Sequence, residues 1–282
     1  MKLGLIGLSI QQSSSPAMHE MLGQLYHYPV SYQLHEPLEN TQEAFSATLL
    51  EMRATGYRGA NITYPFKQLA LHHCNSVNTA VKLVGATNTM KISGSEIQGF
   101  NTDYTGFISA YRHRMGDQPA GKVLLIGAGG VGRAVAFGLF ELGTTEVVIY
   151  DLYPASATSL ADAINSAGFN ASTVTAEQLA AVAAECDGLV NCTPIGHYKT
   201  PGIPISAAAI GPQKWAFDAI YTPIDTEFLQ CCANAGMKIV SGFDLFFYQA
   251  LNAFEIFTGT KPDPEKVMSE YRHRFKIEST LV

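Results

Sequence analysis

A glycine-rich segment followed by an acidic residue has the residue types and spacing that bind a dinucleotide. Residues 127–132 read Gly-Ala-Gly-Gly-Val-Gly, and they follow an apolar stretch at residues 123–126. Asp151 comes 19 positions after Gly132, at the end of a second apolar stretch. A strand, a G-x-G-x-x-G turn, a helix and a second strand ending in an acid form a dinucleotide-binding fingerprint. The residues expected to contact the dinucleotide are Gly127, Ala128, Gly129, Gly130, Val131, Gly132 and Asp151.

Each part of this fingerprint has a physical task. The first glycine allows a tight turn, the second lets backbone N–H groups approach the pyrophosphate, and the third lets helix and strand pack closely. Asp151 suits ribose hydroxyls, and at ~4 Å it would repel the extra phosphate of NADP by roughly 4 kcal/mol per unit charge before screening. The sequence therefore predicts NAD rather than NADP. Two simpler interpretations are an ordinary strand-to-helix turn and a solvated aspartate at a strand end.

Strand-like and helix-like segments alternate along the chain, which indicates an α/β fold with parallel sheets covered by helices. Strands are expected at residues 2–6, 30–34, 59–63, 123–126, 146–150, 188–191, 215–218 and 238–240. Helices are expected from Pro16, at residues 41–55 and 103–115, from the glycine segment to Leu142, and from Phe243 to a Gly259 cap.

The length of 282 residues suits two domains. We expect a discontinuous substrate-binding and catalytic domain at residues 1–104 and 243–282. A doubly wound Rossmann domain is expected at residues 105–242. The cleft between them is the predicted binding site.

Composition limits the kinds of partner. The net charge of −6 and the scattered basic residues argue against nucleic acid, so we expect a small-molecule substrate. The apolar start of the chain is too short for a signal peptide, and no apolar run approaches the ~20 residues that span a bilayer. The five cysteines have no Cys-x-x-Cys spacing and the His72-His73 pair has no metal-ligand spacing, so we expect reduced thiols, no metal and a cytoplasmic protein. The sequence leaves the oligomeric state open between a monomer and a homodimer.

Three polar residues outside the glycine segment carry little information singly. Lys67 and Asp103 would be surface residues in most proteins, and Asp103 could also cap the helix that follows it. Ser15 before Pro16 has the pattern of an ordinary N-cap. Their significance comes from the blocks of sequence around them.

These blocks, taken together and in order, resemble the shikimate dehydrogenase family, including its quinate/shikimate branch. They cover residues 7–19, 59–67, 85–89, 101–103, 127–132, 191–196 and 218–223, together with Gly242 and Gln249. No single block is specific to this family, whereas the joint occurrence of the blocks over nearly the whole chain is specific to it. The resemblance implies hydride transfer between a nicotinamide cofactor and a cyclic hydroxy acid, in the chorismate pathway of aromatic amino acid biosynthesis.

The resemblance also implies roles for individual residues. Ser13 and Ser15 would hold the substrate carboxylate, Lys67 would act as the acid/base, and Asp103 would be its hydrogen-bonding partner. The other residues that would hold the ring hydroxyls or the carboxylate are Thr63, Asn88, Tyr221 and Gln249. Thr193 and Gly242 would complete the cofactor site. The protonation state of Lys67 is not determined by the sequence.

Several positions depart from the family pattern. Ser9 and Gln12 stand where a proline and a histidine are common, and Tyr104 stands where the family has glycine after Asn-Thr-Asp. His197 takes a place often held by methionine, and Asp151 replaces an Asn-Arg-Thr type of NADP-phosphate clamp. These departures favour the NAD-linked quinate/shikimate type.

We therefore predict oxidation of shikimate to 3-dehydroshikimate, of quinate to 3-dehydroquinate, or both. The alternatives are a relative that acts on another ring acid and a ligand-sensing relative without turnover. A glutamyl-tRNA reductase would need a nucleophilic cysteine, yet only Cys74 precedes the glycine segment. A methylene-tetrahydrofolate dehydrogenase would have no use for the carboxylate site at Ser13 and Ser15.

Overall fold

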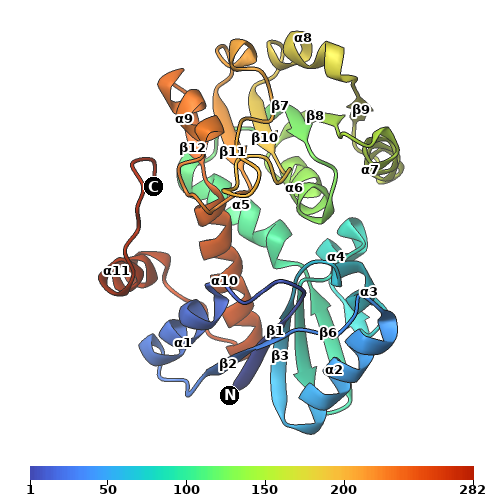
Figure 1. The fold of residues 1–282 in the computed structure, drawn as a ribbon, viewed down its shortest axis with the longest axis vertical. Helices are drawn as coiled ribbons and strands as arrows, with labels where there is room; N and C mark the ends of the chain where they lie inside the picture. The colour runs from blue at the N-terminus through green and yellow to red at the C-terminus, as the bar shows by residue number, and fades with distance from the viewer. The chain divides into compact units, whose positions relative to one another are not determined.

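The computed structural model describes all 282 residues, which divide into two compact units (Figure 1). The first unit consists of Met1–Thr102 and Gln249–Ile277, and the second of Asp103–Tyr248 and Glu278–Val282. The chain therefore passes from one unit to the other at the start of helix α5 (Thr102–Met115), inside helix α10 (Gly242–Thr258), and a third time after Ile277. The last residues of the chain, Glu278–Val282, belong to the second unit, whereas the sequence analysis assigned them to the first domain.

The elements of the first unit are mostly short. They are β1 (Lys2–Ile6), α1 (Ser15–Leu25), β2 (Ser31–His35), α2 (Gln42–Ala54), β3 (Tyr57–Ile62), α3 (Lys67–Leu71), β4 (Ser76–Val77), α4 (Thr79–Val84), β5 (Thr89–Ser93), β6 (Glu96–Phe100) and α11 (Pro264–Arg274). Helix α10 (Gly242–Thr258) contributes its second half to this unit.

The second unit continues the alternation of strands and helices. Its elements are α5 (Thr102–Met115), β7 (Gly121–Ile126), α6 (Gly130–Phe140), β8 (Thr144–Tyr150), α7 (Pro154–Ser166), β9 (Ala171–Thr173), the 3-10 turn η1 (Ala176–Gln178), α8 (Leu179–Ala183), β10 (Gly188–Asn191), η2 (Ala207–Ala209), β11 (Trp215–Asp218), α9 (Glu227–Asn234) and β12 (Lys238–Val240). The strands expected at residues 188–191, 215–218 and 238–240 have these same bounds.

The sheet of the first unit is mixed, which corrects the expectation of parallel sheets throughout. Its strand order is β2-β1-β3-β5-β6-β4, and β5 is antiparallel to both β3 and β6. The sequence analysis missed the β5–β6 hairpin. Only Gly94 and Ser95 connect these two strands, and a two-residue connection forces them to run antiparallel. Gly94 supplies the positive φ, +63°, that such a turn requires.

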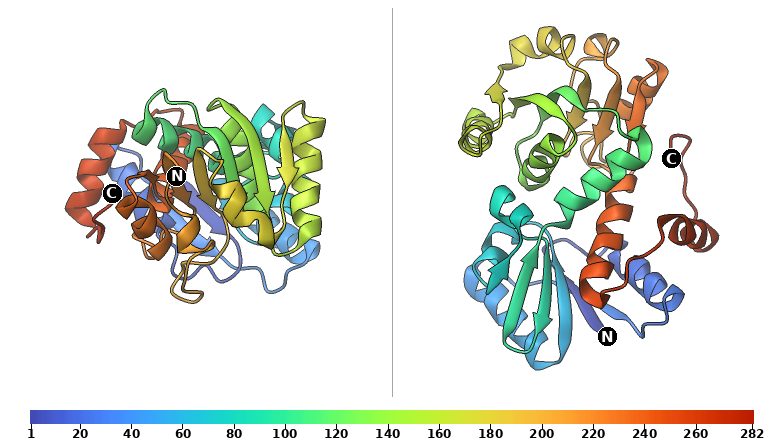
Figure 2. Two further views of the ribbon diagram at one scale, coloured as in Figure 1. Left: turned by 90° about the horizontal axis from the view of Figure 1, so that it is seen from above. Right: turned by 180° about the vertical axis from the view of Figure 1, so that it is seen from behind.

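Alternation along the strands of the first unit places apolar side chains on both faces of the sheet. Leu3 and Leu5 of β1 pack with Ala253 and Phe257 of α10, whereas Ile6 packs in a separate core with α2. Two views show α10 on one side of this sheet and α2 on the other (Figures 1 and 2). This period of two is the geometry of a strand buried on both faces.

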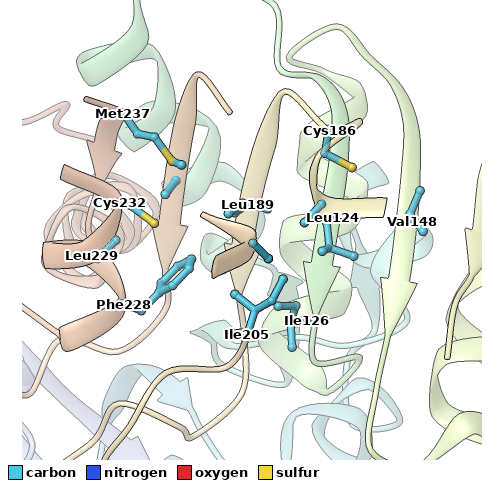
Figure 3. Close-up of a cluster of buried hydrophobic side chains, with 13 residues drawn as sticks. Leu124, Ile126, Val148, Cys186, Leu189, Ile205, Phe228, Leu229, Cys232 and Met237 are labelled. Carbon is cyan, nitrogen blue, oxygen red and sulfur yellow. The ribbon is translucent and has the colours of Figure 1, made fainter. Parts of the chain in front are cut away.

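The sheet of the second unit is entirely parallel and doubly wound, as predicted. Its order is β12-β11-β10-β7-β8-β9. One face carries the cluster in Figure 3, in which Leu124, Leu189 and Ile205 meet Phe228 and other residues of the α9 segment. On the opposite face, Phe107 and Tyr111 of α5 make edge contacts with Phe217 and Trp215, at centroid distances of 4.9 and 5.0 Å.

The helix that contains Pro16 begins one residue earlier than a cap at Ser15 would allow. Ser15 is already its first residue, and Ser14 at the cap position makes no side-chain cap hydrogen bond. Instead, the Ser15 backbone N–H donates to Ser13 Oγ at 3.2 Å. Ser13 therefore accepts a hydrogen bond from one of the backbone N–H groups at the start of the helix. Ser15 is not the N-cap that the sequence suggested.

Two properties bear on partners and modification. No helix of the structure combines the length and the hydrophobicity that a membrane crossing requires. No cluster of three histidine, cysteine or acidic side chains has the arrangement to hold a metal ion, and all five cysteines are free thiols.

A buried histidine lies between α1 and the sheet of the first unit. His19 is 2% exposed and stacks on Tyr32, with the ring centroids 4.8 Å apart and the planes 8° from parallel. Its Nδ1 atom has no hydrogen-bond partner. Burial lowers the pKa of His19 from 6.5 to about 3, so the ring is neutral in the folded protein at neutral pH.

We predict that His19 makes folding sensitive to mild acid. The unfolded chain takes up this proton below pH 6.5 and the folded chain only near pH 3, so stability is complete above pH 6.5 and falls as the pH drops toward 3. In urea titrations, His19→Phe should lose less stability than the wild type between pH 7.5 and 4.5, by roughly 2 to 3 kcal/mol. His72→Asn, on the exposed histidine of the same unit, should behave like the wild type. Equal losses in His19→Phe and the wild type would contradict the prediction.

Candidate functional site

The glycine segment joins β7 to α6 in a turn that depends on two of its glycines for packing. Gly127 has a φ of +100°, and a Cβ added there would lie 2.7 Å from the Cys192 carbonyl carbon. A Cβ at Gly132 would lie only 2.0 Å from the Gly127 carbonyl oxygen. A side chain at either position would push the turn away from the strand or the helix.

Gly129 and Gly130 differ, because an added Cβ would meet no protein atom within 4 Å at either position. Gly129 is the N-cap of α6 and supplies no side-chain cap, so the first N–H groups of the helix face an open surface. An exposed helix N-terminus with positive partial charge suits a pyrophosphate. The turn fits a dinucleotide, since its two central glycines leave room where the backbone must approach a ligand.

Asp151 follows the last residue of β8 and is tied directly to this turn. Its Oδ2 accepts a hydrogen bond from the Ala128 N–H at 2.7 Å, and its Oδ1 accepts one from the Tyr153 N–H at 2.8 Å. The carboxylate is therefore held at the edge of the glycine turn while part of it stays exposed. Lone pairs that these bonds do not use can accept from vicinal hydroxyls.

In the first unit, the serine pair is joined to a buried tyrosine. The Ser13 and Ser15 hydroxyl oxygens lie 3.1 Å apart, and the Ser15 side chain also bonds the Tyr32 hydroxyl. Burial raises the pKa of Tyr32, so its hydroxyl stays protonated. The hydroxyl donates a hydrogen bond to Asn61 Oδ1 at 2.9 Å. The two serines are thus positioned by a residue on the neighbouring strand β2.

The same network continues to Asn88, which is 3% exposed. Asn61 Nδ2 donates to Thr89 Oγ1 at 3.0 Å, and Thr89 Oγ1 lies 3.1 Å from Asn88 Oδ1. Asn88 Oδ1 accepts from the Thr102 N–H at 2.6 Å, and Asn88 Nδ2 donates to Gln249 Oε1 at 3.4 Å. The structure therefore brings Ser13, Ser15, Asn88 and Gln249 into one hydrogen-bonded chain at one end of the sheet.

Thr63 and Lys67 belong to the segment that follows β3, the strand that carries Asn61. Thr63 follows β3, and its N–H donates to the Ile6 carbonyl at 2.9 Å. Lys67 is the first residue of α3 and is partly buried, and its carbonyl accepts from the Thr87 N–H at 2.9 Å. Backbone bonds thus attach Thr63 to β1, and Lys67 to Thr87, the residue directly before Asn88.

Asp103 and Tyr221 belong to the second unit. Asp103 lies in the first turn of α5, is 4% exposed, and directly follows the Thr102 backbone that Asn88 holds. Tyr221 is 38% exposed and stacks on Phe246, with centroids 5.4 Å apart and planes 14° from parallel.

A buried amide and a buried carboxylate stand at the ends of β10 and β11. Asn191 and Asp218 are both 0% exposed, and Asn191 Nδ2 donates to Asp218 Oδ1 at 3.0 Å. Asn191 Oδ1 accepts from the N–H and hydroxyl of Thr193, at 3.0 and 2.7 Å. Burial raises the pKa of Asp218 to about 7, although the bonds from Ile220, Thr226 and Asn191 lower it.

Gly242 is the first residue of α10 rather than part of the preceding strand. A Cβ there would lie 2.3 Å from the Ile220 carbonyl oxygen. Close packing between the β11 turn and α10 therefore requires glycine at this position, whatever else it contacts.

The sequence analysis assigned no role to several residues that organise the site. Asn61, Thr89, Asn191 and Asp218 lie inside the quoted blocks, and a polar residue within or at the end of a buried strand is a signal that could have identified them. Tyr32 carries no such signal, because a tyrosine in a strand is ordinary and its hydroxyl partners come from distant segments.

Comparison with known proteins agrees with this architecture. Residues 5–90 match the family model for the shikimate dehydrogenase substrate binding domain, and residues 123–200 match that for the saccharopine dehydrogenase NADP binding domain. The chain is 36% identical to a quinate/shikimate dehydrogenase (NAD(+)) of Corynebacterium efficiens, over 95% of this chain and 96% of that protein. It is 34% identical to a shikimate dehydrogenase (NADP(+)) of Streptomyces avermitilis, over 95% and 94%.

A solved structure extends the similarity to three dimensions. Quinate dehydrogenase from Corynebacterium glutamicum in complex with NAD superposes with a TM-score of 0.89 and 31% sequence identity, over 97% of this chain and 99% of that one. The fold and the glycine turn define a two-unit α/β protein with a dinucleotide-binding fold. The chain belongs to the shikimate dehydrogenase family. The comparisons support a nicotinamide dinucleotide as cofactor, and the relatives are named for both NAD and NADP.

Two glycine variants separate packing from binding in the turn. Gly132→Ala should lower the stability of the second unit by about 1 to 3 kcal/mol, because its methyl group overlaps the Gly127 carbonyl. Gly129→Ala should leave stability nearly unchanged, since its methyl meets no protein atom, but weaken dinucleotide binding about tenfold or more by filling the approach to the pyrophosphate. Urea unfolding and NADH titration measure the two effects. Undiminished NADH affinity in Gly129→Ala would contradict this assignment.

Proposed function

We propose that this protein is a dehydrogenase that transfers a hydride between NAD and a cyclic hydroxy acid, shikimate, quinate or both. In this proposal the first unit binds the acid and the second binds the dinucleotide. The observation that carries it is the hydrogen-bonded chain from Ser13 and Ser15 to Asn88 and Gln249, inside a unit that matches a shikimate dehydrogenase substrate binding domain.

The chain of bonds suits a ring acid that carries a carboxylate and several hydroxyls. Two serine hydroxyls at the start of a helix can donate to a carboxylate, which the helix N-terminus also favours. The amides of Asn88 and Gln249 offer both donors and acceptors to hydroxyls. Thr63 would add a hydroxyl contact to the same ring.

The chemistry requires a base at the reacting hydroxyl. A nicotinamide bound by the second unit would supply the acceptor for the hydride, which is the carbinol hydrogen with its bonding electron pair. As the C–H bond breaks and the C=O bond forms, the hydroxyl proton passes to the Nζ atom of Lys67 in its neutral form. In the reverse direction, protonated Lys67 returns that proton to the carbonyl oxygen.

The function is tested by a spectrophotometric matrix of NAD and NADP against shikimate, quinate and related ring acids. The proposal expects NADH formation with shikimate or quinate. Formation of reduced cofactor with none of these acids, by a folded protein that binds them, would instead favour the ligand-sensing alternative.

Replacement of Lys67 should remove turnover without removing the binding sites. Lys67→Met keeps the length of the side chain but cannot move a proton, so kcat should fall by about 10² to 10⁴-fold. NADH affinity should stay within about twofold, because the glycine turn is unaltered. Lys82→Met, on an exposed lysine of the same unit, serves as the matched control and should keep wild-type turnover. Near-normal kcat in Lys67→Met would remove Lys67 from the mechanism.

NAD is the cofactor that Asp151 favours. Its carboxylate is fixed beside the glycine turn by two backbone N–H groups, and no basic residue follows it in Leu152, Tyr153 and Pro154. A ribose with free hydroxyls can donate to this carboxylate, whereas a 2′-phosphate would place like charges together.

Removal of the charge at Asp151 should reduce the preference for NAD. Asp151→Asn retains an oxygen for the Ala128 N–H, which is the bond to the glycine turn, and loses only the bond from the Tyr153 N–H. The ratio of kcat/KM for NAD to that for NADP should fall about tenfold or more once the repulsion is gone. Asp162→Asn, on an exposed acid of α7, should not change the ratio. A wild-type kcat/KM for NADP that equals or exceeds the kcat/KM for NAD would overturn the assignment.

A further inference from the structure

The Asn191–Asp218 pair lies where two parallel strands end side by side. Asn191 is the last residue of β10 and Asp218 the last residue of β11, and the two are direct partners in the strand register. Besides the bond between them, each side chain bonds the backbone that follows its own strand. Neither side chain has any exposed surface, so the pair acts inside the protein rather than on a ligand.

Asn191 holds the turn after β10 with every polar atom of its amide. Its Oδ1 accepts from the Thr193 N–H and hydroxyl, and its Nδ2 donates to the Ile195 carbonyl at 2.9 Å as well as to Asp218. The turn at residues 192–196 therefore has its shape set by one side chain.

Asp218 does the same for the turn after β11. Its Oδ1 accepts from the Ile220 N–H at 3.0 Å, and its Oδ2 accepts from the Thr226 hydroxyl at 2.7 Å. Thr226 in turn caps α9 by accepting from the Leu229 N–H. The two turns are thus fixed to one another through the 3.0 Å bond between the amide and the carboxylate.

Both turns press against elements of the cofactor site. A Cβ at Gly127 would lie 2.7 to 2.9 Å from the backbone of Cys192 and Thr193, so the β10 turn packs directly on the glycine turn. The Ile220 carbonyl packs on Gly242 in the same way. The pair therefore connects the glycine turn, the Thr193 turn and the start of α10.

The strand order shows which half of a dinucleotide these turns would meet. Asp151 ends β8, the glycine turn follows β7, and β10 and β11 lie on the opposite side of β7 from β8. A dinucleotide on a doubly wound sheet lies across the carboxyl ends of the strands, with its adenosine ribose at the acid and its pyrophosphate at the glycine turn. Its nicotinamide half therefore extends over β10 and β11.

We propose that Asn191 and Asp218 are positioning residues for the nicotinamide end of the cofactor, because they hold the two turns on which that end rests. This inference depends on the proposed nicotinamide cofactor. Neither residue touches the cofactor, so its adenosine end should not respond when the pair is broken.

Asn191→Asp tests the proposal with almost no change of shape. It places a carboxyl oxygen where the amide nitrogen was, facing the Ile195 carbonyl and the Asp218 carboxyl group, so the two hydrogens that the amide donates are replaced by at most one acid proton and at least one attractive contact becomes repulsive. The Kd for NADH should rise about tenfold or more, and the Kd for ADP-ribose, which lacks nicotinamide, should stay within about threefold. If the wild type prefers NADPH, then NADPH and 2′-phospho-ADP-ribose are the probes. Fluorescence titration or calorimetry measures both without relying on turnover.

A second substitution provides a rescue. Asp218→Asn alone should raise the NADH Kd less than Asn191→Asp does, because its amide oxygen can still accept from Ile220 and Asn191 while its amide nitrogen donates to Thr226. In the Asn191→Asp background it removes the facing carboxylate, so Asn191→Asp/Asp218→Asn should recover part of the lost NADH affinity. Asn165→Asp is the matched control, since Asn165 makes a similar pair of bonds with the Ala171 backbone in the same unit. It should change neither Kd.

Two results of the binding experiment would overturn the positioning role, and a third would overturn the proposed function. Unchanged NADH affinity in folded Asn191→Asp, or equal losses for NADH and ADP-ribose, would overturn the positioning role. A wild type that binds neither NADH nor NADPH would overturn the proposed function and this inference with it.

If Asn191→Asp does not fold, Thr226→Val removes a bond to Asp218 with little change of shape. In this variant the Kd for NADH should rise about threefold while the Kd for ADP-ribose stays unchanged. An unchanged Kd for NADH would overturn the positioning role of the pair.

Discussion

The structure depends on pairing polar groups that are buried where strands end. An unpaired amide in such a place costs about 1 to 3 kcal/mol, so a buried asparagine is retained only where all its polar atoms find partners. Asn88 meets this condition in the first unit and Asn191 in the second. Asn191 bonds the backbone of the turn after β10, whereas Asn88 bonds the backbone N–H at the start of α5 and the Gln249 side chain, so each asparagine connects segments that carry candidate site residues.

Close backbone packing is the second constraint, and it acts at a few glycines. Gly127, Gly132 and Gly242 each leave no room for a Cβ, so the turns around the dinucleotide site touch one another through main-chain atoms. Gly129 and Gly130 face open space, which the packing of the protein does not explain. The difference separates glycines that hold the turn together from glycines that leave room for a ligand.

The two units divide the proposed chemistry. In the first, the buried chain of hydroxyls and amides presents the donors and acceptors that a polyhydroxylated acid needs. In the second, a parallel sheet supplies an exposed helix N-terminus and a fixed acid at the neighbouring strand end. Dinucleotide binding is a general property of this sheet, whereas the choice of acid depends on the side chains of the first unit.

The sequence by itself determined the α/β class, the doubly wound second unit and the family, because glycine turns, buried strands and ordered motif blocks are local patterns. It also singled out Asp151 and the serine pair as candidate site residues. It did not reveal the β5–β6 hairpin, whose strands look like any other short apolar alternation, and it misplaced the cap at Ser15. Only the tertiary structure showed that Tyr32 links Ser15 to Asn61 and that Asn191 meets Asp218. These partners lie far apart in the chain, and a hydrogen bond depends on distance in space, which spacing along the sequence does not encode.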